Sequence, residues 1–203
     1  MKKKIAATVF ICLMFALQIY AQVDSKNLGI PNLEIIGAHE DVDNIICVGN
    51  SVILALLDKD YQTLSKYCSD EVRFSQGLGF SLKYDTLIEK NIISVADVSE
   101  HKIAFYRYEP DKYFFYDLKA VLNNYAPTAQ RLSKVKINGL IKNEESEDRF
   151  LSIINEIFGD CVSLEYYTKE TDLQIDWKCT ILVLRKIDSV YKLVGISIDY
   201  WEP

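Results

Sequence analysis

Apolar residues recur at three- and four-residue steps across residues 40–57, where the pattern is clearest. The positions that share this spacing are Val42, Ile45, Ile46, Gly49, Val52, Ile53 and Leu56. They fall on one side of an α-helix, and the acids in its first turn oppose the positive end of the helix dipole. Asp60 then stands where it can cap a second, shorter helix, and the alternation of Val72 and Phe74 predicts a strand.

The middle of the chain carries shorter patterns of both kinds. The elements expected there are a helix over residues 84–95 capped by Asp85, a strand over 102–108, a helix over 118–125 and a strand around Val135 and Ile137. Ser146 can cap a clearer helix, and Gly159 ends it because glycine readily takes the left-handed conformation.

From Cys161 onward the apolar residues recur at every second position, which is typical of strands. The segments with this period are residues 161–168, 175–185 and 190–201, and Asp188 and Ser189 lie in the second turn. We therefore predict an antiparallel meander of three strands. Residues 181–184 are apolar at every position, which indicates that both faces of the middle strand are covered.

The first twenty-one residues have the pattern of an export signal. Three lysines precede an uncharged apolar run that ends at Leu17, and Ala21 suits a signal peptidase. The run is shorter than the roughly 20 residues that a membrane-spanning helix needs. We expect a cleaved signal peptide over residues 1–21, a leading segment over 22–38, a single domain over 39–203, and export to the periplasm or the medium. A retained membrane anchor is the alternative.

The charge and composition of the chain limit the kinds of partner that it is expected to bind. The formal net charge of the chain is −6, and removal of the three leader lysines makes it −9. A chain this acidic is a poor binder of nucleic acid and of anionic membrane surfaces, so we expect neither as a partner. Metal and cofactor sites are not expected either, because no zinc spacing, calcium loop or phosphate-binding loop occurs. His39 and His101, the two histidines, are both expected to face water.

Four cysteines follow the leader, at positions 47, 68, 161 and 179. Export would allow disulfides, but buried thiols are the favoured interpretation. The expected strand register places Val162 on the face of Cys179, and Cys161 therefore on the opposite face, which argues against that pair. The disulfide state is left open.

The order of these elements resembles the nuclear-transport-factor-2-like superfamily, which has a cystatin-like α+β cone. The stretch "DKDYQTLSKY", the pair Asp176-Trp177 and the ending around Gly195, Asp199 and Trp201 also resemble a group of exported bacterial proteins of unassigned activity. The resemblance implies an α+β fold in which a strongly curved antiparallel sheet wraps around the N-terminal helices. The chain departs from that group at Ile198, where the group has a histidine.

Catalytic members of the superfamily use a carboxylate or histidine base beside hydrogen-bond donors in an apolar pocket. By this resemblance, Asp176 and Asp199 are candidate bases inside the cone. The candidate donors are Tyr106, Tyr108, Tyr166 and Tyr167. The alternative is that the acids are solvated at strand ends and that the tyrosines cover a half-buried sheet.

Trp177 and Trp201 support another interpretation. Aromatic rings beside acids on a curved sheet can bind sugars or other small neutral ligands by stacking and hydrogen bonding. The same rings can instead pack in the core or in a homodimer interface on the outer face of the sheet.

Two classes of function follow. The favoured one is an exported non-catalytic domain that binds a small ligand or a partner protein through the cone or the sheet face, because no catalytic set can be assembled from the residue types present. The alternative is a cofactor-independent isomerase or hydrolase with an aspartate base inside the cone.

Overall fold

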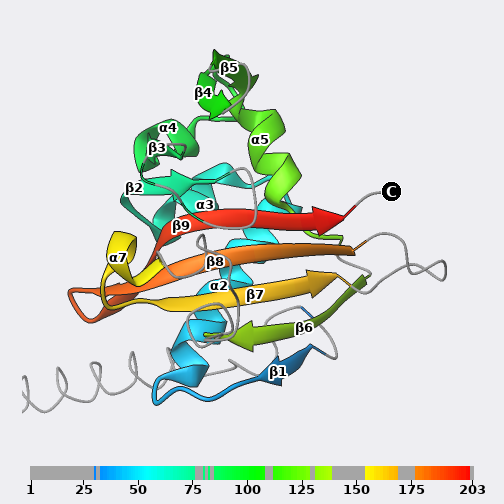
Figure 1. The fold of residues 1–203 in the computed structure, drawn as a ribbon, viewed down its shortest axis with the longest axis vertical. Helices are drawn as coiled ribbons and strands as arrows, with labels where there is room; N and C mark the ends of the chain where they lie inside the picture. Colours follow the sequence, from blue (N-terminus) through cyan, green and yellow to red (C-terminus); the bar gives the residue numbers. More distant parts are fainter. Residues whose placement is uncertain are drawn as a thin grey trace, which may run out of the picture.

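The computed structural model describes residues 30, 33–75, 80, 82, 85–107, 112–128, 131–138, 154–168 and 177–201. Figure 1 shows an open sheet of seven strands, with helix α2 crossing behind it and the short helix α7 in front. The helices in this part of the chain all lack the length and apolarity needed to span a membrane.

Three predicted helices are confirmed. They are α2 (Val42–Leu57), α3 (Tyr61–Tyr67) and α5 (Leu118–Tyr125). Asp60 caps α3 as predicted, because its Oδ1 atom accepts a hydrogen bond of 2.9 Å from the backbone N–H of Thr63. Asp117 caps α5 in the same way, through the backbone N–H of Ala120.

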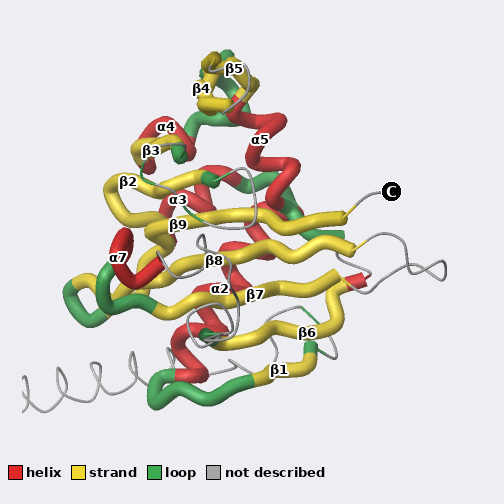
Figure 2. Tube along the Cα trace, in the orientation of Figure 1, coloured by secondary structure: helices red, strands yellow, loops and turns green. Residues whose placement is uncertain are grey.

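The main sheet has the strand order β1-β6-β7-β8-β9-β2-β3. Its strands are β1 (Glu34–Ile36), β2 (Cys68–Phe74), β3 (Thr86–Glu89), β6 (Leu132–Ile137), β7 (Val162–Thr168), β8 (Trp177–Ile187) and β9 (Val190–Trp201). β7, β8 and β9 pair antiparallel in sequence order, so the predicted C-terminal meander is confirmed. β4 (Lys102–Arg107) and β5 (Lys112–Asp117) form a separate hairpin, which Figure 2 shows at the end of the molecule beyond α5.

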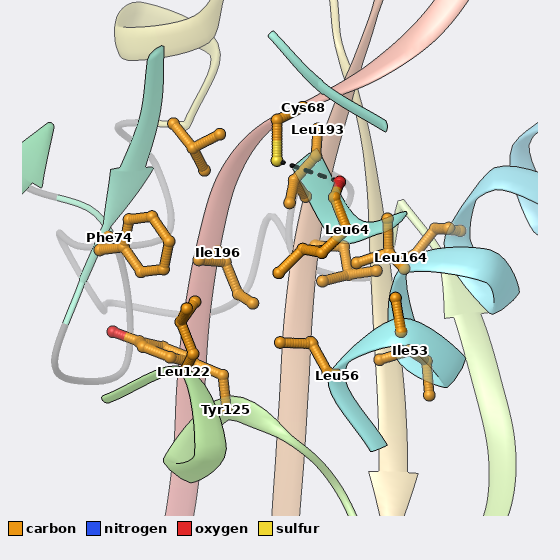
Figure 3. Close-up of a cluster of buried hydrophobic side chains, with 14 of the residues drawn as sticks. Ile53, Leu56, Leu64, Cys68, Phe74, Leu122, Tyr125, Leu164, Leu193 and Ile196 are labelled. Atoms are coloured by element: carbon orange, nitrogen blue, oxygen red, sulfur yellow. Dashed lines mark hydrogen bonds between the residues drawn. The ribbon is translucent and has the colours of Figure 1, made fainter. Parts of the chain in front are cut away.

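Side chains fill the space between the helices and the sheet. One buried cluster joins α2, α3 and α5 to the strands. Figure 3 shows its middle, where Ile53, Leu56 and Leu122 from the helices point toward Leu164 and Ile196 of the sheet. Each of these five side chains is at most 1 % exposed. The helix face of the sheet is therefore packed as a core and does not enclose an open pocket around these residues.

The outer face of the sheet is covered by the same chain. α7 (Ile154–Phe158) packs there together with Phe80. The rings of Phe80 and Phe158 meet edge to face, with 4.8 Å between their centroids. Gly195 permits this approach, because a Cβ atom there would lie 2.5 Å from Cζ of Phe158. Residues 181–184 are at most 2 % exposed, so their predicted two-sided burial is confirmed and needs no second copy of the chain.

The predicted fold class, a strongly curved antiparallel sheet wrapped around N-terminal helices, is wrong. The sheet is mixed, because β1 runs parallel to β6 and β2 runs parallel to β9. It is open, with β1 and β3 at its edges, and it does not curl into a cone around α2. Alternation with period two identifies a strand but neither its neighbour nor its direction, which is why the sequence did not indicate this order.

The prediction of one helix over residues 84–95 is also wrong. β3 occupies Thr86–Glu89, and α4 (Lys90–Ser94) follows it directly. Ile88 is buried opposite Val72 of β2, whereas Leu87 is half exposed. This alternation is that of a strand at the edge of a sheet.

The sequence pattern did not indicate β1 or β5, whose described apolar side chains are mostly exposed. The helix expected from Ser146 lies outside the described residues except for α7. Gly159 follows α7 with a φ of +67°, so its predicted role at the helix end is confirmed.

The four cysteines after the leader are free thiols in the structure. The prediction that Cys161 and Cys179 lie on opposite faces is wrong, because both belong to the cluster on the outer face. The register pairs Tyr167 with Cys179, so the two cysteine positions are six residues apart along the strands. At about 3.3 Å per residue this is far more than the roughly 7 Å that a disulfide can span between Cα atoms.

The start of α2 is tied to the β8–β9 hairpin through Asp41. Its Oδ2 atom accepts hydrogen bonds from Nζ of Lys186 at 2.6 Å and from the hydroxyl of Tyr191 at 3.1 Å. The backbone N–H of Asp41 donates to Nδ1 of His39 at 3.0 Å. The Lys186 ammonium and then the Tyr191 hydroxyl stabilise the carboxylate and lower the pKa of Asp41 from its ordinary value.

This contact predicts a loss of stability in acid. A carboxylate whose pKa is lower in the folded state stabilises the fold above its unfolded pKa, and the contribution is lost as the pH falls through the folded value. We expect the free energy of unfolding to decrease below about pH 4, and Asp41→Asn to remove part of that decrease. Urea unfolding at neutral and at acid pH measures it. Asp43→Asn, at an exposed position of the same turn, is the control, and equal pH dependence in both variants would contradict the role of Asp41.

Candidate functional site

A groove opens on the surface where α3, β2, α4 and the β8–β9 turn meet. Its volume is about 470 Å³, and small-molecule sites in proteins occupy roughly 300–1,000 Å³. α3 ends at Tyr67 and the chain passes directly into β2, whose parallel pairing with β9 brings Cys68 beside Leu193. α4 and the turn at Asp188 line the remaining sides. The groove therefore depends on three segments that are far apart in the sequence.

Three lysines and two aspartates line the groove, so its formal charge is +1 within a chain of formal charge −6. They are Lys66, Lys90, Lys192, Asp70 and Asp188. Nζ of Lys90 lies 2.5 Å from Oδ1 of Asp70, and both side chains are at least half exposed. The Lys90 ammonium lowers the pKa of Asp70 from its ordinary value. Because so exposed an ion pair contributes little to stability, a ligand can replace Asp70 as the partner of Lys90.

Lys192 lies across the end of α3. Its Nζ atom donates a hydrogen bond of 2.7 Å to the backbone carbonyl of Lys66, one of the carbonyls that the helix leaves without a partner. An ammonium group has three donors, so Lys192 retains two for another acceptor. The hydrogen bond to Lys66 thus holds this ammonium at the groove and leaves donors for a ligand.

Cys68 lines the groove but is not an activated nucleophile. It is 3 % exposed, and its thiol donates to the carbonyl of Leu64 at 3.4 Å, as Figure 3 shows. Burial raises the pKa of Cys68 to about 12, so the group is a neutral thiol at physiological pH. The described groove residues thus offer charges and hydrogen bonds without a reactive thiolate.

Among the described side chains, the structure places the candidate donor Tyr166 and the candidate base Asp199 apart. Tyr166 is buried in the helix-face core, where its hydroxyl donates a hydrogen bond of 2.8 Å to Oδ1 of Asn50. Burial raises the pKa of Tyr166 well above its ordinary value. Asp199 pairs with Cys179 in the register of β8 and β9, which places it on the outer face. The sheet therefore separates this candidate base from this candidate donor.

The other predicted site residues lie outside the described residues, either wholly or in their side chains. Asp176 lies outside the described residues, as do the side chains of Tyr106, Trp177 and Trp201. The backbone register pairs Trp177 with Trp201 directly across β8 and β9. Stacking of a ligand on these rings stays a prediction.

Tyr167, another of the candidate donors, belongs to a polar cluster on the same outer face as Asp199. The hydroxyl of Tyr167 donates a hydrogen bond of 2.5 Å to Oε2 of Glu165. The ammonium groups of Lys134 and Lys136 each lie 4.9 Å from the centre of the Tyr167 ring. These residues alternate on β6 and β7, but only the pairing of the two strands reveals that they meet.

Cys179 lies beside this cluster, opposite Tyr167 in the register. Burial raises its pKa well above the ordinary value, and the nearby carboxylates of Glu165 and Asp199 raise it further. The thiol is therefore protonated and unreactive. The part of the chain that the structure describes holds no group of three histidine, cysteine, aspartate or glutamate side chains placed to bind a metal ion.

Comparisons with known proteins add little to this description. No family model and no curated protein matches the chain. A crystal structure of a DUF4783 family protein from Bacteroides fragilis is similar at 11 % sequence identity, over 73 % of this chain and 94 % of that one, with a TM-score of 0.33. The resemblance to the nuclear-transport-factor-2-like superfamily is not confirmed by these comparisons.

Proposed function

We propose that the chain is an exported, non-catalytic domain that binds a small ligand in the groove between α3, α4 and the β8–β9 turn. The groove itself carries this proposal, because its volume and its charged, hydrogen-bonding lining suit a small polar molecule. Cys68 is the groove residue that belongs to the helix-face cluster, and it is already packed there with 3 % exposure, so a ligand can occupy the groove above it.

The geometry favours binding over catalysis. A cofactor-independent isomerase or hydrolase needs a base held against hydrogen-bond donors in a desolvated pocket. Asp199 and Tyr166 lie on opposite faces of the sheet, and Cys68 is protonated.

Export is proposed from the leader sequence, and a mature chain beginning at Gln22 in a mass spectrum would support it.

Nuclear magnetic resonance tests where small molecules bind. We expect binders from a mixed library of small polar compounds to shift the backbone amides of residues 65–70 and of Lys192. Asn91→Trp places a large ring at the lining of the groove. It should lower the affinity of these compounds about tenfold, which corresponds to the loss of at least one good hydrogen bond.

Asn44→Trp is the matched control, because Asn44 is exposed on α2 and does not line the groove. It should leave the affinities unchanged. Binders that map instead to the outer face around Tyr167, or a library that leaves the groove amides unmoved, would contradict the proposed site.

A further inference from the structure

The lining of the groove also indicates the chemical class of its ligand. We infer that the groove binds a small hydroxylated oxyanion, which is a phosphate or carboxylate carried on a polyhydroxylated body. This inference rests on the proposed function, because it concerns the same groove. It depends on three observations: the lysines, the direction of the hydrogen bonds at the serines, and the size and composition of the lining.

The lysines of the groove indicate that the ligand carries an anionic group. The ammonium of Lys192 is held at the end of α3 with two donors to spare, and Lys90 has only an exposed carboxylate as its partner. Lys66 completes a lining in which positive charge exceeds negative charge, on a protein that is acidic overall. Ammonium groups bind phosphate and carboxylate oxygens as point charges, so an oxyanion is the ligand group that this lining favours.

The serines of the groove indicate that the ligand also carries hydroxyl groups. Ser65 donates its hydroxyl proton to the carbonyl of Gln62, and Ser94 donates to that of Asn91. The hydroxyl of Ser69 likewise has only carbonyl partners, those of Glu71 and Leu193, for its one proton. A hydroxyl has one proton and two lone pairs, so serines bonded in this way present acceptors to a ligand. The complementary ligand group is a donor such as a hydroxyl.

Asn91 adds a neutral donor to the same lining. Its Oδ1 atom accepts the backbone N–H of Ile92 at 2.8 Å, which leaves the amide NH₂ to donate. A ligand hydroxyl can both accept from this amide and donate to a serine oxygen. A polyhydroxylated body therefore fits better than one with donors or acceptors alone.

Size and composition exclude two simpler ligands. The groove of about 470 Å³ is far larger than a bare phosphate requires, since one water occupies about 30 Å³ of liquid. The described residues that line it include no aromatic side chain, so among them a nucleobase would find no ring to stack on. Sugar phosphates and sugar acids remain as the class that matches both the charge and the hydrogen bonds.

Titration of the full chain with glucose 6-phosphate, gluconate, glucose and inorganic phosphate tests this inference, with backbone amide shifts and calorimetry as readouts. We expect glucose 6-phosphate or gluconate to shift the groove amides and to bind at least tenfold more tightly than glucose or inorganic phosphate. The stronger of the two reveals whether phosphate or carboxylate is preferred.

Two lysine variants connect the affinity to the groove. Lys66→Gln and Lys192→Gln should each lower the affinity for the charged probe about tenfold, as expected for loss of a hydrogen bond to a charged group. Lys102→Gln makes the same charge change at an exposed position of the separate β4–β5 hairpin and should leave affinity unchanged. Thermal unfolding of each variant verifies that it is folded.

The outcomes separate this inference from the proposed function. Glucose binding at the groove as tightly as the charged sugars would overturn the oxyanion class but leave the groove as a ligand site. Equal weakening by Lys66→Gln and Lys102→Gln would also overturn it, because a nonspecific charge effect would then explain the affinity. If neither a probe nor a library compound shifts the groove amides, the proposed function is overturned as well.

Discussion

Replacing Phe158 by alanine is expected to lower the free energy of unfolding by about 3–5 kcal/mol. Phe158 is 5 % exposed and packs edge to face against Phe80, directly over Gly195. Its removal leaves a cavity on the outer face, where α7 and Phe80 are the cover that keeps the middle of β8 from water. Urea unfolding of the wild type and the variant measures the change.

Phe115→Ala is the matched control for this prediction. Phe115 lies on β5 and is 69 % exposed, so the same chemical change there should alter stability by no more than about 0.5 kcal/mol. Equally small losses in the two variants would show that α7 does not seal the sheet, and the second packed face would have to be abandoned.

Replacing Gly49 by valine is expected to lower stability by about 3 kcal/mol or more, through overpacking and the loss of a buried hydrogen bond. A Cβ atom at Gly49 would lie 2.4 Å from Cδ1 of Leu164 and 2.4 Å from the hydroxyl oxygen of Tyr166. That hydroxyl is the donor to Asn50, so pushing it aside leaves buried polar groups without partners. Thermal and urea unfolding provide the measurement.

Two further variants test the cause of this loss. Asn44→Val introduces the same side chain at an exposed position of α2 and should change stability by no more than about 0.5 kcal/mol. Gly49→Ala and Tyr166→Phe should be less than additive, because the added methyl and the hydroxyl compete for the same space. Full additivity would mean that α2 and β7 do not touch at this point.

Local sequence patterns predicted most of the elements. The helical spacing that begins at Val42, the cap at Asp60 and the alternation after Cys161 each correspond to an observed helix or strand. These features depend on neighbours along the chain, so their signals are local. The fold class failed for the opposite reason, since the parallel pairing of β2 with β9 joins residues more than a hundred positions apart.

The candidate groove was missed for the same reason. Lys66 lies in the last turn of a short helix, Lys90 begins another, and Lys192 lies on the C-terminal strand. Each is an ordinary surface lysine in its own segment. They become neighbours only when β2 lies beside β9. Asp199 and Tyr166 are each on a strand as expected, but alternation without the observed register could not show that they face opposite ways.

The pairing of β2 with β9 therefore underlies both the sheet and the groove, and contacts between backbone protons in the isotope-labelled protein test it most directly. We expect the parallel pattern of such contacts between Arg73 or Phe74 and Gly195 or Ile196, together with slow exchange of the Ser75 amide, which donates to the carbonyl of Ile196 at 3.0 Å. Contacts that place another strand beside β9, or an antiparallel pattern between β2 and β9, would contradict the sheet order and remove the groove with it.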